Sequence, residues 1–301
     1  MRRTTGPLLL FVLSAALAYS AQPVSKPQES YAPYWTSEPG WTTELQLKNN
    51  LVSAPLTVTP VLRLASGREI PLDPATIPSN TSISVWVNEG LLAHASDLLS
   101  QPGSYGSVVF RYTSPSAGNL YANALLSIHG EPISFPMLAR TESTIPVSPG
   151  SSLEGIWWQP RPNLNDVLII GNHGDSQIAG VLSLYDANGK QWHQQVTLGP
   201  RQTLRMSTSD LLKKAGLSGS YGGISFVTDG PVASIDAAHF MYDEASKFSS
   251  SQELMRRDPS ATLRQYAGPE ARHWTMYAPM LALQHPDPTI GLPGGWNSNP
   301  P

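Results

Sequence analysis

Short segments in which apolar and polar residues alternate recur along most of this chain. Residues 43–47 read Thr-Glu-Leu-Gln-Leu, and residues 83–87 alternate β-branched residues with Ser84 and Trp86. A period of two residues is typical of a half-buried β-strand. The segments are short and are separated by Asn, Pro, Gly and Ser, which favour turns. The pattern therefore predicts an all-β fold made of many short strands.

One stretch of the chain occurs twice with its surroundings. Gly-Ser-Tyr-Gly is found at residues 103–106 and again at 219–222. Ser-Asp-Leu-Leu precedes it both times, at 96–99 and 209–212. The spacing of leucines before each copy, as in residues 91–99, predicts a short helix there, which Ser or Asp can cap. An internal repeat is the first feature to look for in a sequence, and here it predicts one module built twice.

Further segments match in the same order. A strand-like segment ends at Asn49 and another at Asn172, and Tyr34-Trp35 is echoed by Trp157-Trp158. Pro-Met-Leu-Ala occurs at 136–139 and at 279–282. This last segment is either the final strand of each module or the start of a next one.

The arrangement resembles tandem immunoglobulin-like β-sandwich modules of uncharacterised secreted bacterial proteins. The resemblance rests on the strand that ends in Asn, on Ser-Asp-Leu-Leu before Gly-Ser-Tyr-Gly, and on Ala-Pro-Met-Leu-Ala-Leu-x-His-Pro-Asp-Pro at 278–288. It covers most of residues 34–288. It implies two β-sandwiches and no particular activity.

These patterns divide the chain into six parts. We expect a signal peptide at 1–21, a linker at 22–33, module one at 34–139, a linker at 140–154, module two at 155–283 with an insertion at 246–273, and a Pro/Gly-rich tail at 284–301.

The N-terminus has the features of an export signal. Arg2 and Arg3 precede a short apolar stretch, and Ala16-Leu17-Ala18 offers a small-x-small cleavage site. The apolar stretch is shorter than the ~20 residues that span a bilayer. We therefore expect an exported protein, periplasmic, cell-surface or extracellular, whose mature chain has no membrane span.

Composition narrows the choice of function. Charged residues make up only 14% of the 301 residues and the net charge is −3, which gives no basic surface for nucleic acid. The chain has no cysteine, so disulfides, thiolate metal sites and thiol catalysis are excluded.

Candidate chemistry is sparse. Gly-x-Ser-x-Gly does not occur, and Gly-Ser-Tyr-Gly has the wrong spacing for a nucleophile elbow. Histidines and aspartates that could ligate a metal do not show paired spacing, so we expect no catalytic, cofactor or metal site. The metal candidates considered are His173, Asp175, His193, His239 and the pair His285 and Asp287.

Tryptophans are the remaining candidates, because exposed aromatic faces stack on sugars or partners. The residues considered for ligand stacking are Trp35, Trp41, Trp157, Trp158 and Trp192. Core packing is the favoured role for them. Our interpretation is a secreted, non-enzymatic surface interaction or scaffolding protein that binds a surface protein or a polysaccharide. The alternatives are a pair of carbohydrate-binding modules and a hydrolase with its site at the module junction.

The repeated tyrosines lead to a local expectation. Tyr105 and Tyr221 should occupy equivalent positions, each packed on the short helix of its own module. A tyrosine between two glycines can place its ring on an apolar stripe while its hydroxyl reaches a polar partner.

Overall fold

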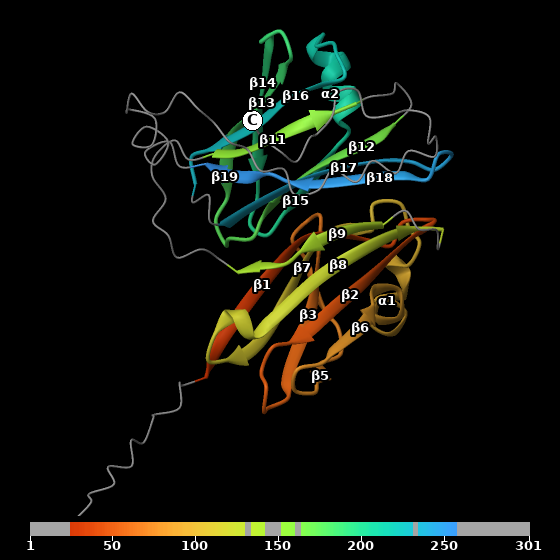
Figure 1. Ribbon diagram of the computed structural model, residues 1–301, viewed down its shortest axis with the longest axis vertical. Helices are drawn as coiled ribbons and strands as arrows, with labels where there is room; N and C mark the ends of the chain where they lie inside the picture. Colours follow the sequence, from red (N-terminus) through yellow and green to blue (C-terminus); the bar gives the residue numbers. More distant parts are fainter. Residues whose placement is uncertain (1–24, 130–133, 142–151, 160–163, 231–233, 258–301) are drawn as a thin grey trace, which may run out of the picture. The chain divides into compact units, whose positions relative to one another are not determined.

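The computed structural model describes residues 25–129, 134–141, 152–159, 164–230 and 234–257 (Figure 1). This part of the chain is mostly β-strand, with two short α-helices, so the all-β prediction is confirmed. The expected signal peptide, most of the 140–154 linker and the tail lie outside the described residues. Within those residues, no helix is both long and apolar enough to cross a membrane.

Two pairs of antiparallel sheets contain all the paired strands described. In the first sheet pair, sheet A has the strand order β10-β1-β7-β3-β4 with β5 beside β3, and sheet B has the order β6-β2-β8-β9. In the second sheet pair, sheet C has the order β14-β13-β16-β11-β19, and sheet D has the order β15-β12-β17-β18.

The strands of the first pair are β1 (Lys26–Thr36), β2 (Trp41–Asn49), β3 (Leu56–Leu64), β4 (Glu69–Pro71), β5 (Ala75–Ile77), β6 (Ser82–Trp86), β7 (Tyr105–Ser114), β8 (Leu120–Ile128), β9 (Ser134–Leu138) and β10 (Arg140–Thr141). Those of the second pair are β11 (Ser152–Trp158), β12 (Asn165–Asn172), β13 (Ile178–Asp186), β14 (Gln191–Leu198), β15 (Thr203–Met206), β16 (Tyr221–Thr228), β17 (Ile235–Asp243), β18 (Phe248–Glu253) and β19 (Met255–Arg257).

Each sheet pair encloses its own hydrophobic core. In β2 the alternation turns Leu45 and Leu47 inward, where they join Leu62 of β3 and Phe110 of β7. The second core has the same character, with contributions from both sheet C and sheet D. Its fully buried members are Trp157, Leu168, Ile170, Leu182, Leu184, Ile224, Phe226 and Ile235. Ile169 and Ala238, on the other face of sheet D, pack against the first core.

A short helix precedes each Gly-Ser-Tyr-Gly, as predicted. Helix α2 (Thr208–Ala215) begins after Ser207, whose hydroxyl accepts a hydrogen bond from the Asp210 backbone N–H at 3.2 Å. It ends at Gly216, which adopts the left-handed conformation common at helix C-termini. Helix α1 (Val87–His94) starts earlier than expected and is followed by a 3₁₀ turn, η1 (Ser96–Leu98). A second 3₁₀ turn, η2 (Ala117–Asn119), leads into β8.

Three of the expected segments differ from the structure, and one of them, the linker 140–154, contains β10 and the start of β11. Most of the predicted linker 22–33 belongs to β1, because Lys26 already pairs with Ser114 of β7. Strands β18 and β19 lie in the predicted insertion 246–273 and form the edges of sheets D and C. Pro-, Ser- and Gln-rich composition favours a linker at 22–33, whereas pairing with β7 makes most of it a strand. Pairing with β17 and β11 likewise makes β18 and β19 parts of the sheets.

Candidate functional site

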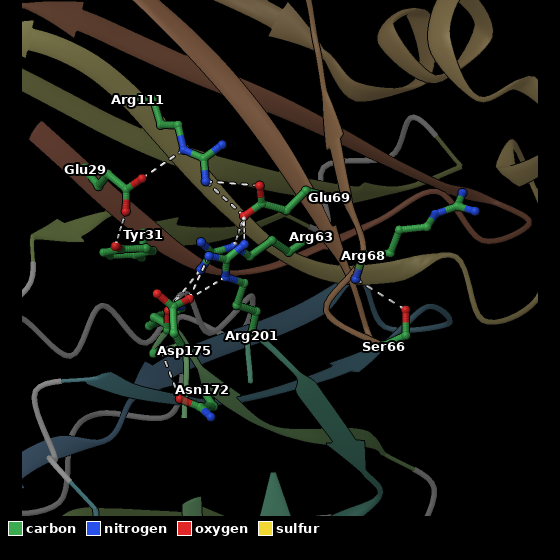
Figure 2. A network of polar contacts seen from close by, with 12 residues as sticks. Glu29, Tyr31, Arg63, Ser66, Arg68, Glu69, Arg111, Asn172, Asp175 and Arg201 are labelled. Carbon is green, nitrogen blue, oxygen red and sulfur yellow. Dashed lines mark hydrogen bonds and ion pairs between the residues drawn. The ribbon is translucent and has the colours of Figure 1, made fainter. Parts of the chain in front are cut away.

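A pocket of about 420 Å³ lies where the first sheet pair meets loops of the second. Its floor is the outer face of sheet A, with Glu29 and Tyr31 from β1, Arg63 from β3 and Arg111 from β7. Its other wall is the loop 173–178, which follows β12, together with Arg201. Figure 2 shows Arg63 and Arg111 from one side and Asp175 and Arg201 from the other, directed toward one another.

A chain of ion pairs runs through this pocket. Arg111 Nε donates to Glu29 at 2.8 Å, and its Nη2 donates to both oxygens of Glu69 at 2.9 and 3.0 Å (Figure 2). Arg63 Nε donates to Glu69 at 2.9 Å, although its side chain is only 2% exposed. Arg201 lies 3.4 Å from Glu69 and 2.7 Å from Asp175. Three guanidinium groups therefore face three carboxylates, and each carboxylate has a cationic partner.

His173 closes the pocket from the second sheet pair. Its Nε2 is 2.8 Å from Asp236 Oδ2, and its ring stacks on Tyr31 with centroids 4.5 Å apart. Its backbone carbonyl accepts a hydrogen bond from Arg63 Nη1 at 3.3 Å. The histidine thus serves as a spacer that joins β1, β3 and β17.

A second anchor joins the two sheet pairs at another point. Arg205 of β15 forms a two-pronged pair with Glu38, with Nη2 3.0 Å from Oε1. The same guanidinium donates to the Tyr34 hydroxyl at 2.9 Å and lies 4.1 Å from the centre of the Tyr105 ring. Beside it, Phe240 of β17 packs on the first core.

The electrostatics of the network indicate a structural role. Burial alone would raise the pKa values of Glu29, Glu38 and Glu69, but hydrogen bonds from arginine and the other partners lower all three below the ordinary glutamate value. The carboxylates are therefore ionised at neutral pH. A glycosidase needs one carboxyl group kept protonated as a general acid, and these groups are held in the opposite state.

The metal candidates from the sequence are engaged separately. His173 pairs with Asp236, Asp175 with Arg201, and His193 Nδ1 with the Ser183 hydroxyl at 2.8 Å. Across the ranges that the structure describes, no group of three or more acidic or histidine side chains could hold a metal ion. His285 and Asp287 lie outside those ranges.

His239 points into the second core, and burial lowers its pKa to about 4 from an ordinary value of 6.5. The unfolded chain therefore takes up a proton that the folded protein resists, so stability falls as the pH drops below 6.5 toward 4. We expect the free energy of unfolding to fall by about 2 kcal/mol between pH 7 and pH 5 through this residue. In urea titrations, His239→Leu should not show this fall in unfolding free energy between pH 7 and pH 5, whereas the variant His94→Gln, at an exposed site, should still show it. Identical pH profiles for His239→Leu and the parent protein would contradict this.

Two of the stacking candidates have no exposed face. Trp35 and Trp157 are fully buried, and each indole N–H donates to a backbone carbonyl, that of Arg63 at 3.0 Å and that of Tyr185 at 2.9 Å. This removes them from the set of residues that could stack on an external ligand.

The other three candidates are more accessible. Trp41 is half-buried against Tyr242, with centroids 5.4 Å apart in an edge-on contact. Trp192 is half-buried beneath the Lys214 ammonium, 5.6 Å from the ring centre. Trp158 is 39% exposed and contacts Phe248 edge-on at 5.8 Å. The candidates therefore do not gather into one row.

An apolar surface that sequence reasoning missed lies on the outer face of sheet C. Alternation along β11, β16 and β19 brings five exposed hydrophobic side chains to this face: Ile156, Trp158, Tyr221, Val227 and Met255. Gly223 lies among them, and the ring of Tyr185 covers it, 3.3 Å from where a Cβ would stand. We call this surface the open face.

Tyr105 and Tyr221 have different surroundings. Tyr105 is half-buried beneath the Arg205 guanidinium, as part of the junction between the sheet pairs. Tyr221 is 55% exposed, so the expectation that it packs on α2 is wrong. Tyr221 is the first residue of β16 and pairs with Trp158, so its side chain points to the open face, away from the core.

No protein-family model matches this chain, and no curated protein matches it either. The resemblance to secreted immunoglobulin-like proteins therefore stays a prediction.

The junction residues carried a weak signal in the sequence. In a chain with few charges, Arg63 and Arg205 interrupt apolar strand segments, Val-Leu-Arg-Leu and Thr-Leu-Arg-Met. A charged residue in a buried strand requires a partner. That rule could have identified both arginines, but not the glutamates with which they pair.

Proposed function

We propose that this protein is an exported, non-enzymatic interaction or scaffolding protein that consists of two copies of one immunoglobulin-like β-sandwich module, joined rigidly. The observation that carries the proposal is the agreement of strand order between the sheet pairs. Sheet A, read β10-β1-β7-β3-β4, corresponds to sheet C, read β19-β11-β16-β13-β14. Sheet B corresponds to sheet D in the same way.

Local details support the repeat. Trp35 lies opposite Gly106, and Trp157 lies opposite Gly222. A Cβ at either glycine would come within 2 Å of a backbone carbonyl, that of Arg63 at 1.8 Å or that of Tyr185 at 1.9 Å. Glycine is therefore required at both places. Trp157 is thus the counterpart of Trp35, one residue away from the alignment suggested by the sequence.

The asparagines that end β2 and β12 give a second match. The Asn49 side chain accepts from the Leu51 N–H at 2.8 Å, and the Asn172 side chain accepts from the Gly174 N–H at 3.0 Å. Each also donates its amide to backbone carbonyls of the loop it closes. Two independent loops built on the same hydrogen bonds favour duplication of one module.

The junction supports a scaffold rather than a hinge. Ion pairs at Glu69 and Glu38, the His173–Tyr31 stack and the Phe240 contact hold the modules at several separate points. A rigid pair of modules presents its outer surfaces in a fixed relation, which suits a spacer or an interaction platform at the cell surface.

Binding to isolated cell envelopes tests this function. Labelled full chain should bind saturably, and protease treatment of the envelopes should abolish binding while periodate oxidation of their glycans should not. A panel of ester and glycoside substrates should show no turnover. Turnover that Glu69→Gln abolishes would overturn the non-enzymatic proposal and favour a hydrolase at the junction.

A carbohydrate-binding function is the second candidate, because the open face combines Trp158, Tyr221 and Tyr185 on one sheet. Aromatic rings of this kind stack on sugars. It predicts loss of envelope binding after periodate treatment and retention on a polysaccharide column that Trp158→Ala removes.

A further inference from the structure

The junction inside the chain covers one face of the first module with one end of the second. The covered face is the outer side of sheet A, with Tyr31, Arg63, Glu69 and Arg111. The covering end over this face consists of residues 173–175 and Arg201, while Arg205 and Phe240 contact the first module elsewhere. Because the modules correspond strand for strand, each of these two surfaces has a counterpart that the junction leaves unused.

The counterpart of the covered face is the open face. Strand register places Tyr185 at the position of Arg63. Arg63 pairs with the residue after Gly106, and Tyr185 pairs with the residue after Gly222. The same register equates Gln191 with Glu69 and Val227 with Arg111. Arg63, Glu69 and Arg111 are therefore replaced by aromatic, amide and aliphatic groups, while Glu154 takes the position of Tyr31.

The counterpart of the covering end lies in the first module, at residues 50–52 and 78–80, which we call the docking loops. The Asn80 N–H donates to the Leu51 carbonyl at 2.8 Å, as the Arg201 N–H donates to the Gly174 carbonyl at 3.1 Å. Both Asn80 and Arg201 have positive φ, 50° and 59°. Val52 takes the position of Asp175 and is 83% exposed.

The two unused surfaces differ from the surfaces of the internal junction in matching ways. Asn80 takes the position of Arg201, and Gln191 takes the position of Glu69. The ion pair between Arg201 and Glu69 inside the chain is therefore replaced, between copies, by two amides that can hydrogen-bond to each other. Strand register equates Arg140 with Met255, and Glu253 with position 138. The ion pair between Arg140 and Glu253 inside the chain is therefore replaced, between copies, by Met255 of one copy facing position 138 of the next. Asp175, a charged loop residue, corresponds to the apolar Val52.

We propose that copies of this chain associate head to tail, with the docking loops of one copy seated on the open face of the next in the geometry of the internal junction. This inference rests on the proposed two-module scaffold and supplies its partner, a second copy. Inside the chain the contact is made largely by ion pairs, whereas between chains amide and apolar groups would meet, and the one carboxylate at an equivalent position, Glu154, lies 3.9 Å from Arg257 of its own sheet. This difference would direct each surface to its proper partner. The contact joins two different surfaces, so it can continue from copy to copy.

Two variants separate the surfaces. Val52→Asp places a charge in the docking loops and leaves the open face intact. Met255→Arg places a charge on the open face and leaves the loops intact. Both positions are exposed, so melting temperatures should match that of the parent protein.

Sedimentation velocity of the full chain, up to about 1 mM, measures the association. The parent protein should form a concentration-dependent series of species, and each variant alone should sediment as a monomer. An equal mixture of the two variants should form dimers and nothing larger, because only one complementary contact can form.

Three results would overturn the head-to-tail contact: a monomeric parent protein, self-association of either variant at the parent level, or a mixture that stays monomeric. Retention on a polysaccharide that Met255→Arg abolishes and Val52→Asp does not would assign the open face to carbohydrate instead. The envelope test is independent, so a monomeric parent protein that still binds envelopes would refute self-association and leave the proposed function intact.

Discussion

Replacing Trp157 with alanine should lower the free energy of unfolding by about 4 kcal/mol. The indole is fully buried in the core of the second sheet pair, and its N–H donates to the Tyr185 carbonyl at 2.9 Å. Its ring also lies 2.6 Å from where a Cβ on Gly222 would stand, so the strand is shaped around it. Truncation would leave a cavity and remove the hydrogen bond to the Tyr185 carbonyl in the same place.

The neighbouring tryptophan provides the matched control. Trp158 is the next residue of the same strand but points to the open face, and its removal should cost about 1 kcal/mol or less. Urea unfolding followed by circular dichroism measures both variants. Equal losses for Trp157→Ala and Trp158→Ala would show that the two side chains do not divide between core and surface as described.

The alternation of apolar and polar residues and the repeated segments predict much of the fold. The strand ending at Asn49, the strand ending at Asn172 and the helix before each Gly-Ser-Tyr-Gly all appear in the structure. These features depend on local periodicity and capping, which a short window of sequence contains. Composition predicts a linker at residues 26–33, because their strand pairing with β7, more than 70 residues away along the chain, is not visible in a local window.

Local sequence patterns do not predict the junction between the sheet pairs or the open face. Glu29, Glu38 and Glu69 become partners of arginines only once the sheets have been assembled. Tyr105 and Tyr221 share a motif, yet one meets Arg205 and the other meets solvent. The same local sequence thus has different surroundings in the two sheet pairs, because Arg205 of the second pair covers only Tyr105.

Replacing Arg205 with methionine should cost about 3 kcal/mol of unfolding free energy, because the variant leaves Glu38 as a largely buried carboxylate without a cation. Glu38 is 15% exposed and would keep only the Gly103 N–H at 2.7 Å and the Thr36 hydroxyl at 3.4 Å among its described partners. The double variant Arg205→Met with Glu38→Gln should recover most of the loss, since replacing both members of such a pair is nearly neutral.

The pH dependence of this difference gives the sharper test. In the parent protein, burial would raise the pKa of Glu38, but hydrogen bonds from Arg205 and Gly103 lower it below its ordinary 4.5. The stabilisation from this carboxylate is therefore fully present above pH 4.5 and is lost as the pH falls through the lowered pKa. Without Arg205 the opposing effect of burial remains, so the carboxyl accepts a proton more readily in the variant than in the parent protein. The stability gap between Arg205→Met and the parent protein should narrow as the pH drops below 4.5, and urea midpoints across that range measure it. A gap that stays constant with pH would mean that the arginine stabilises the junction through its packing on Tyr105, and not through the charge of Glu38.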